Sequence, residues 1–534
     1  MVGLAFTSCE TTELDLLEDP NDVTLDKADL NRFLNQIQLD FASFMRQIGN
    51  NDASLVRVNY MFGRTYANNF QPAVLDGEWD LAYQGMFSDI AAAEALANNV
   101  GANKHLGVMK ILKGYTLLTL VDNWGDVPFS QATNPTEFPA PVADPGASVY
   151  AGAIDLINEG MGLLDLDGDN LENDFYYNND FSKWKKLANS VKMQAYLNTG
   201  DFTSFNAVSS SAITSSADDF QFQYGTNETN PDTRHPSYSG DYTTSGAGNY
   251  RSNWLMETML NSNDPRIRYY FYRQNPCTPG GNDANGNPCP ANQDLTCSAA
   301  PRPNHFPVSM TFCSVDSGYW GRDHGNAEGI PQDGLKRAVI GVYPAGGKFD
   351  GDEYSSIGIG DGGAGAGILP IMLASDTDFM RAEVALASNN SGAASSALNA
   401  AISKSIAKVQ SFVSLDPTAI TTFIPSSTEV NNYISGVINN FNNASSDGKW
   451  EILATQQFIG NYGSGIASYN LYRRTGYPKL VQFNIDPNPG SFIRSFLYSA
   501  SEANVNSNIT QKPGVNIQVF WDTNPASPGF PTAN

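Results

Sequence analysis

The stretch that decides the fold is KHLGVMKILKGYTLLTLVDNWGDVPFSQ, residues Lys104–Gln131. Within it, Val108–Val121 has the length of a helix and is apolar on almost every side, with Lys110 and Lys113 forming a narrow charged seam. A helix that is hydrophobic all round, yet too short to span a membrane, is buried between other helices. The sequence therefore predicts a core helix within a helical stack, ended by a turn at Gly125.

Apolar residues recur at helical spacing on both sides of this core helix. The segment 76–98 is joined to it by the short linker NNVGAN, which predicts an antiparallel helical hairpin. Further helices are predicted at about residues 30–45, 148–164 and 181–197, as a pair at 379–386 and 398–409, and at 430–441 and 449–462. The fold class is therefore mainly α, a tetratricopeptide-like stack of helical hairpins with a large loop-rich, partly β or irregular insertion.

Changes in composition divide the chain into five segments. The apolar run before Cys9 resembles the end of a lipoprotein signal that lacks its basic n-region, and an ordinary N-terminus with a stray thiol is the alternative. The predicted segments are a signal-peptide remnant ending at lipidation site Cys9 (1–9), an acidic tether (10–24), a helical-hairpin region (25–200), a loop-rich ligand-binding region (201–370) and a C-terminal helical and irregular region that packs on the stack (371–534).

The net charge of −24 over 534 residues argues against a nucleic-acid partner, because no basic patch could offset that field. The same charge disfavours docking to anionic lipid, so contact with a membrane is expected only through a lipid anchor. Charged residues make up only 16% of the chain, while Asn, Ser, Gly and Tyr are abundant. This composition suits an extracellular surface with long hydrogen-bonding loops.

Four cysteines lie close together in a segment rich in Pro, Gly and Asn. They are Cys277, Cys289, Cys297 and Cys313. An exported loop with few apolar residues needs covalent crosslinks, which predicts two disulfides whose pairing the sequence leaves open. A zinc site is the competing interpretation, although the spacing contains no CxxC pair.

Several motifs resemble, in order along the chain, those of the SusD/RagB family of nutrient-capture lipoproteins on the surface of Bacteroidetes. They are WGDVPF (124–129), KWKKLANSVKMQAYL (183–197), NDPRIRYYF (263–271), GRDHG (321–325), VYPAGGKFD (342–350), LPIMLASDTDFMRAEVAL (369–386) and YRRTGYP (472–478). The family's later Arg-x-Pro-Tyr-Pro element is kept only in part, in FIRSFLYSASEANVN (492–506). The resemblance implies a SusD-like fold, an outer-membrane, cell-surface location, a lipid anchor and a SusC-like TonB-dependent transporter as partner.

The sequence offers little for catalysis. It has four histidines, with no HExxH motif and no GxSxG motif around a serine, so a non-enzymatic role is expected. Calcium is the one cofactor considered, because Asp165, Asp167 and Asp169 occupy the first, third and fifth places of an EF-hand loop. The Gly and Glu that this loop requires are missing, and a solvated turn between helices is the alternative.

For a sugar-capturing protein, the useful side chains are loop aromatics beside amides and arginines. Sugar rings stack their C–H faces on aromatic rings, while polar groups bind the hydroxyls. Three loop stretches carry such side chains: Tyr66, Asn68 and Asn69; Tyr250 and Trp254; Tyr319, Trp320 and Arg322. Tyr319 and Trp320 are the preferred pair, because they follow the cysteine-rich loop.

The predicted function is therefore capture of oligosaccharide or polysaccharide at the cell surface, and its delivery to the transporter. A peptide ligand, as in RagB-type relatives, is the nearest alternative. A secreted α-helical glycoside hydrolase and a scaffold that binds only a protein partner are the others.

Overall fold

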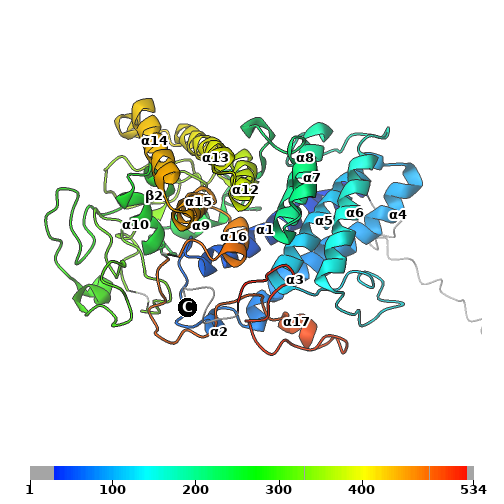
Figure 1. Ribbon diagram of the computed structural model, residues 1–534, viewed down its shortest axis with the longest axis horizontal. Coiled ribbons are helices and arrows are strands. Elements are labelled where there is room, and N and C mark those ends of the chain that lie inside the picture. The colour runs from blue at the N-terminus through cyan, green and yellow to red at the C-terminus, as the bar shows by residue number, and fades with distance from the viewer. Residues whose placement is uncertain (1–28, 330, 480, 526–534) are drawn as a thin grey trace, which may run out of the picture.

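The computed structural model describes residues 29–329, 331–479 and 481–525. A long helix, α1 (Leu30–Leu55), runs through the middle of the molecule and contacts α4 (Ser88–Val100), α5 (Asn103–Trp124) and α16 (Ile466–Thr475). Figure 1 shows the N-terminal helices at one end of the molecule and the long loops of the central region at the other. The fold is mainly helical, as the sequence predicts.

The N-terminal helices pair as hairpins. The helix predicted at 76–98 is continuous from α3 (Asp76–Asp80) through the π-helical segment η3 (Leu81–Phe87) to α4, and Gly101 ends it in the left-handed conformation. The core helix α5 follows after two residues and packs along α6 (Gly146–Leu163). The other elements of this part are α2 (Tyr66–Asn69), η2 (Pro72–Leu75), α7 (Phe181–Thr199), α8 (Phe202–Ser209) and η4 (Ser216–Asp218).

Helix α5 is buried in the way its composition predicts. From His105 to Trp124, only Lys110 and Lys113 are partly exposed. Gly114 allows the close approach of α6, because a Cβ at that position would lie 2.6 Å from Cγ1 of Ile157. The glycine that looks like a helix breaker in the sequence is thus a packing requirement between two helices.

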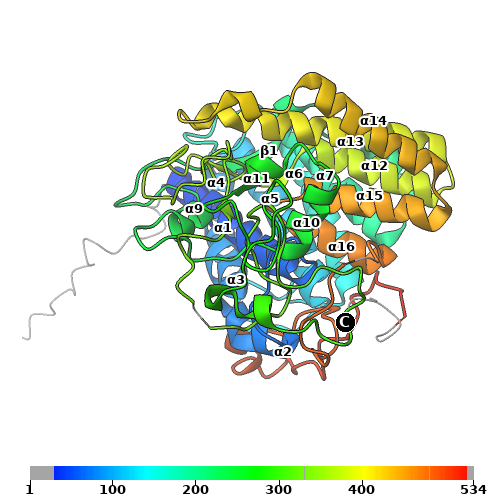
Figure 2. The same cartoon turned by 90° about the vertical axis from the view of Figure 1, so that its left-hand side faces the viewer.

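The central region is loop-rich and contains only short strands. Strand β1 (Phe220–Gln223) pairs antiparallel with β4 (Ile368–Met372), and β2 (Phe271–Tyr272) pairs antiparallel with β3 (Val339–Ile340). The short helices of this region are α9 (Pro236–Asp241), α10 (Asn253–Asn261), α11 (Ile267–Tyr270) and η5 (Gln293–Ala299). Figure 2 shows these loops from their own side, lying over α1 and next to the later helices.

The C-terminal part adds a second group of helices and an irregular tail. Its elements are α12 (Ala374–Ala387), α13 (Ser391–Ser411), η6 (Phe412–Leu415), η7 (Thr421–Phe423), α14 (Ser427–Asn443), α15 (Ser446–Gly460), α16 and α17 (Ala500–Ala503). Helices α12, α13, α14 and α15 enclose an apolar cluster of their own, separate from the main core.

Buried charged side chains hold the C-terminal segment to helices that come earlier in the chain. Asp122, at the end of α5, accepts hydrogen bonds from Nε1 of Trp521 (2.9 Å) and Nδ2 of Asn470 (2.8 Å), while Arg473 donates to its backbone oxygen (2.6 Å). Arg474 forms a bidentate pair with Glu383 on α12, at 2.9 and 2.8 Å. The arginines of the YRRTGYP motif thus hold the C-terminal segment to the helical stack, which is a structural role.

Candidate ligand-binding site

The two aromatic residues favoured by the sequence are interior side chains. Trp320 is 1% exposed and packs with Leu295, Cys297 and Cys313, and Tyr319 is 2% exposed, with the Arg273 guanidinium carbon 4.7 Å from its ring centre. A ring with no exposed face offers no surface for a sugar. The prediction that Tyr319 and Trp320 form the binding platform is therefore wrong.

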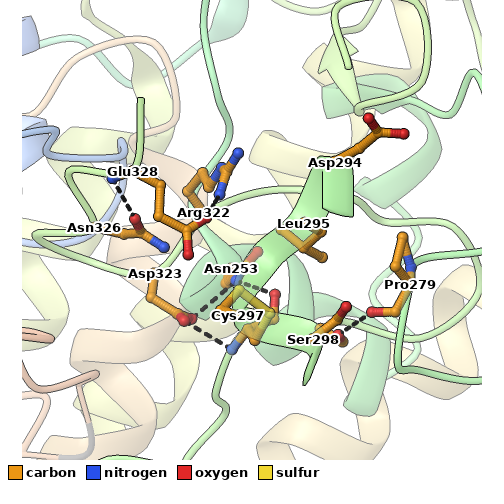
Figure 3. The surroundings of a disulfide bond; sticks show 12 residues. Asn253, Pro279, Asp294, Leu295, Cys297, Ser298, Arg322, Asp323, Asn326 and Glu328 are labelled. Carbon is orange, nitrogen blue, oxygen red and sulfur yellow. Dashed lines mark hydrogen bonds and ion pairs between the residues drawn. A yellow bond between two sulfur atoms is a disulfide. The ribbon is translucent and has the colours of Figure 1, made fainter. Parts of the chain in front are cut away.

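The reason for their burial is the crosslinked loop that precedes them. The structure pairs Cys277 with Cys289 and Cys297 with Cys313, with Cα–Cα distances of 5.8 and 5.7 Å. Beside the second disulfide, Asp323 accepts from Nδ2 of Asn253 at 2.9 Å, as Figure 3 shows. The crosslinked loop folds back over the Trp320 ring, so it forms a small core and leaves the ring covered.

Most of the other predicted ligand residues also have internal roles. Trp254 and Tyr66 belong to the main core. Asn69 donates from Nδ2 to the backbone oxygens of Gly63 and Thr65, at 2.9 and 2.8 Å. These contacts order the loop and α2, and they correct the assignment of these three side chains to ligand binding.

Of the remaining predicted residues, Asn68 is exposed and lies apart from the cleft described below. Arg322 is buried and forms ion pairs with Glu328 and Asp333. Tyr250 lies on the open cleft described below, and Tyr319, although buried, borders a second groove.

The aspartates proposed for calcium do not come together. Within the described parts of the chain, no three His, Cys, Asp or Glu side chains form a group that could hold a metal ion. Asp165 instead pairs with Lys185 at 2.5 Å, across the turn between α6 and α7. The arrangement of Asp165, Asp167 and Asp169 is therefore that of a solvated turn, which was the alternative interpretation.

The open cleft has a volume of about 530 Å³, within the usual size of ligand sites. It lies where the end of α1 meets the loop after it, the start of α9 and the segment 248–251. Its lining side chains are Arg46, Asn50, Ser54, Asn59, Tyr60, Phe62, Pro236, Ser237, Asn249, Tyr250, Arg251 and Arg337. A small inner cavity of about 30 Å³ shares Arg46, Asn50 and Arg251 with it and reaches His235.

Three aromatic rings line this cleft, and they differ in how much of the ring a ligand could contact. Tyr250 is in contact with two guanidiniums, those of Arg337 and Arg322, whose central carbons lie 3.8 and 4.5 Å from its ring centre. Tyr60 is half-buried and meets Tyr250 edge to face at 5.7 Å. Phe62 is 56% exposed and is the aromatic side chain best placed to stack on a ligand.

The Tyr250 hydroxyl is fixed in its protonated form. It donates to the Asp333 carboxylate, whose two oxygens both lie at 2.9 Å, and it accepts from Nη2 of Arg322 at 3.0 Å. Burial raises the pKa of the hydroxyl above its ordinary value, partly offset by the hydrogen bond from Arg322. Tyr250 therefore forms part of a rigid wall of the cleft.

Four polar side chains of the cleft, in contrast, are free. Among the residues that the structure describes, the side chains of Arg46, Asn50, Asn59 and Ser237 have no hydrogen-bond partner or ion pair. Free amides, a hydroxyl and a guanidinium beside an exposed aromatic ring are the groups that bind sugar hydroxyls and stack on sugar rings. Sequence reasoning missed Phe62 and Arg46. The run NYMF (59–62), in the segment between the helices predicted at 30–45 and 76–98, could have made Phe62 a candidate, although it does not show that the ring is exposed.

Two other hollows are less suitable. A groove of about 850 Å³ between α10, α11 and α14 is larger, but its arginines Arg268 and Arg273 already pair with Asp350 and Asp352. A cavity of about 40 Å³ beside Asp376 is too small for a sugar ring.

The fold is mainly α, and its helical hairpins carry a cleft whose walls are partly built from loops. Residues 20–498 match the profile of the SusD-like family, described as starch-binding and associating with the outer membrane. The chain belongs to this family, as the sequence motifs indicate. No helix in the described ranges is long and apolar enough to cross a membrane.

Solved structures of the family share the fold. A SusD/RagB family protein from Bacteroides thetaiotaomicron is 17% identical, with a TM-score of 0.66 over 93% of this chain and 99% of that one. A SusD homologue from Bacteroides fragilis is 16% identical, with a TM-score of 0.65 and coverage of 93% and 99%. A chitin-binding SusD homologue from Flavobacterium johnsoniae is 17% identical, with a TM-score of 0.62 and coverage of 92% and 99%. No curated protein matches the sequence.

Proposed function

We propose that the protein captures oligosaccharide in the cleft between Phe62 and Arg46, without chemical turnover. The observation that carries the proposal is the exposed Phe62 ring next to polar side chains that have no partner in the described parts of the chain. The family's starch-binding description and the chitin-binding relative support a carbohydrate as the ligand. The cleft is open, which suits a chain that enters along its length.

We further propose that the protein acts at the cell surface and passes its ligand to a SusC-like TonB-dependent transporter. The family's association with the outer membrane supports this location. A lipid on Cys9, which lies outside the described residues, would hold the protein there. Labelling with a radioactive fatty acid, with Cys9→Ala as the control, tests the anchor. Co-purification with an outer-membrane transporter tests the partner.

Affinity electrophoresis against a panel of soluble polysaccharides tests ligand capture. We expect one glycan class to retard the wild type, and Phe62→Ala to weaken this binding about tenfold, because an aromatic stacking contact contributes roughly 1.4 kcal/mol. Phe520→Ala is the matched control, because Phe520 is an exposed aromatic side chain that does not line the cleft.

Two results would count against the proposal. Failure of every polysaccharide to retard the wild type would argue against glycan capture, and equal binding by Phe62→Ala would argue against this cleft. Release of reducing ends from a retarded polysaccharide would show turnover and support the hydrolase alternative.

A further inference from the structure

The cleft is positively lined in a strongly acidic protein. The chain has 55 acidic and 31 basic residues. Nevertheless, three arginines and no aspartate or glutamate line the cleft in the described ranges. Two of these arginines form ion pairs with buried carboxylates: Arg251 pairs with Asp241, and Arg337 pairs with Asp333.

The carboxylates that pair with the arginines lining the cleft are either shared between two arginines or buried. Asp333 is shared, because it also pairs with Arg322, and Glu328 pairs with Arg322 as well. Asp241 and Asp333 are fully buried, so neither presents its charge to the cleft. In addition, the Nε atoms of Arg251 and Arg337 are buried without an acceptor in the part of the chain that the structure describes. These arginines are therefore not saturated by their partners.

The third arginine, Arg46, forms no ion pair with any residue that the structure describes. It lies on α1, half-buried, at the junction of the cleft and the inner cavity. Glu78 is near enough for the charge of Arg46 to act on it, but burial raises the pKa of this carboxyl above its ordinary value, and its Oε1 accepts from Nδ2 of Asn51 at 2.8 Å.

The inner cavity offers no compensating negative charge. His235 lies there, and its pKa is lowered to about 3 by burial, and further by the charges of Arg46 and Arg251. Its imidazole is therefore neutral at physiological pH and does not change the net charge around Arg46. The Arg46 guanidinium is left to a group that arrives from solvent.

We infer that the ligand of this cleft is an anionic oligosaccharide, whose carboxylate or sulfate pairs with Arg46 while a neighbouring sugar ring stacks on Phe62. The inference rests on the proposed function and specifies its substrate class. A planar guanidinium binds carboxylate or sulfate oxygens through two parallel hydrogen bonds. The positive lining would also concentrate an anionic chain at the cleft, against the repulsion of the acidic protein as a whole.

Isothermal titration with paired polysaccharides tests the inference. Polygalacturonate and its fully methyl-esterified form share a backbone and differ in carboxylate charge. Dextran sulfate and dextran provide the corresponding comparison for sulfate. We expect wild-type protein to bind one anionic member at least tenfold more tightly than its neutral counterpart, and to bind it more weakly as salt rises from about 0.1 M to about 1 M.

Matched variants assign the effect to Arg46. Arg46→Gln should weaken binding of the anionic member about tenfold and leave the neutral member unchanged, whereas Arg46→Lys should retain part of the preference. Arg32→Gln is the control, because Arg32 lies on the same helix about 21 Å away along the axis and is 88% exposed.

The outcomes separate the two proposals. Equal or tighter binding of neutral glycans would overturn the inference and leave glycan capture standing. A preference for anions that Arg46→Gln does not change would also overturn it. Binding of an acidic peptide, with no binding of any polysaccharide, would overturn both proposals and favour the peptide alternative.

Discussion

Replacing Trp320 with alanine should destabilise the protein without removing a ligand contact. The indole is 1% exposed, and burial of an aromatic side chain covers roughly 150–250 Å². At about 25 cal/mol per Å² this area corresponds to roughly 4–6 kcal/mol, and buried Trp→Ala changes cost about 3–5 kcal/mol. Within the described residues the Nε1 of Trp320 has no acceptor, so no hydrogen bond of the indole is lost. We therefore expect a loss of about 3–5 kcal/mol, all of it from packing.

Urea denaturation followed by far-ultraviolet circular dichroism measures this loss. Trp320→Phe should recover most of the stability, because it refills the space between Leu295 and the Cys297–Cys313 disulfide. Phe62→Ala is the converse control: it should leave unfolding within about 0.5 kcal/mol of wild type while weakening glycan binding. A Trp320→Ala protein with unchanged unfolding and lost glycan binding would refute the reasoning and place the indole in the site.

Two further predictions concern buried charge. Arg474→Met should cost about 3–5 kcal/mol in the free energy of unfolding, because it leaves Glu383 buried without its bidentate partner, and adding Glu383→Leu should restore much of it. Burial raises the pKa of Asp376 to about 7, against 3.8 as its ordinary value. Between these values the folded state holds a proton that the unfolded state has released. The free energy of unfolding should therefore fall by up to about 1.4 kcal/mol per pH unit as pH rises from about 4 to 7. Urea titrations across this pH range should show that the free energy of unfolding falls less steeply with pH in Asp376→Asn than in the wild type. An equal dependence on pH would contradict the raised pKa of Asp376.

The helical framework could be predicted from the sequence because its signals are local. An apolar residue every three or four positions specifies a buried helix face, and the two-residue connection of Gly101 and Ala102 makes the helices on either side of it pack together. The crosslinked loop was also foreseeable, since four cysteines gather in a polar segment, although their pairing was not. The motif YRRTGYP indicates that its arginines pair with other parts of the protein, and Arg474 forms such a bidentate pair with Glu383.

The site could not be predicted in the same way, because exposure is a property of the whole fold. Trp320 and Phe62 both stand in irregular segments of the sequence, and nothing near either residue says which one is covered. The crosslinked loop buries the first, while the loop after α1 presents the second.

The sequence alone determined the family, the helical stack and the disulfide-rich loop, since each depends on residues close together in the chain or on a fixed order of motifs. The tertiary structure decided the binding cleft, because its walls come from α1, the loop that follows it, α9 and residues near 250 and 337. It also decided the charge of the cleft: Asp241 and Asp333 are folded inward behind their arginines, and Arg46 alone faces the opening without a carboxylate in the described ranges. Burial and pairing over such separations along the chain are set by packing, which no local pattern encodes.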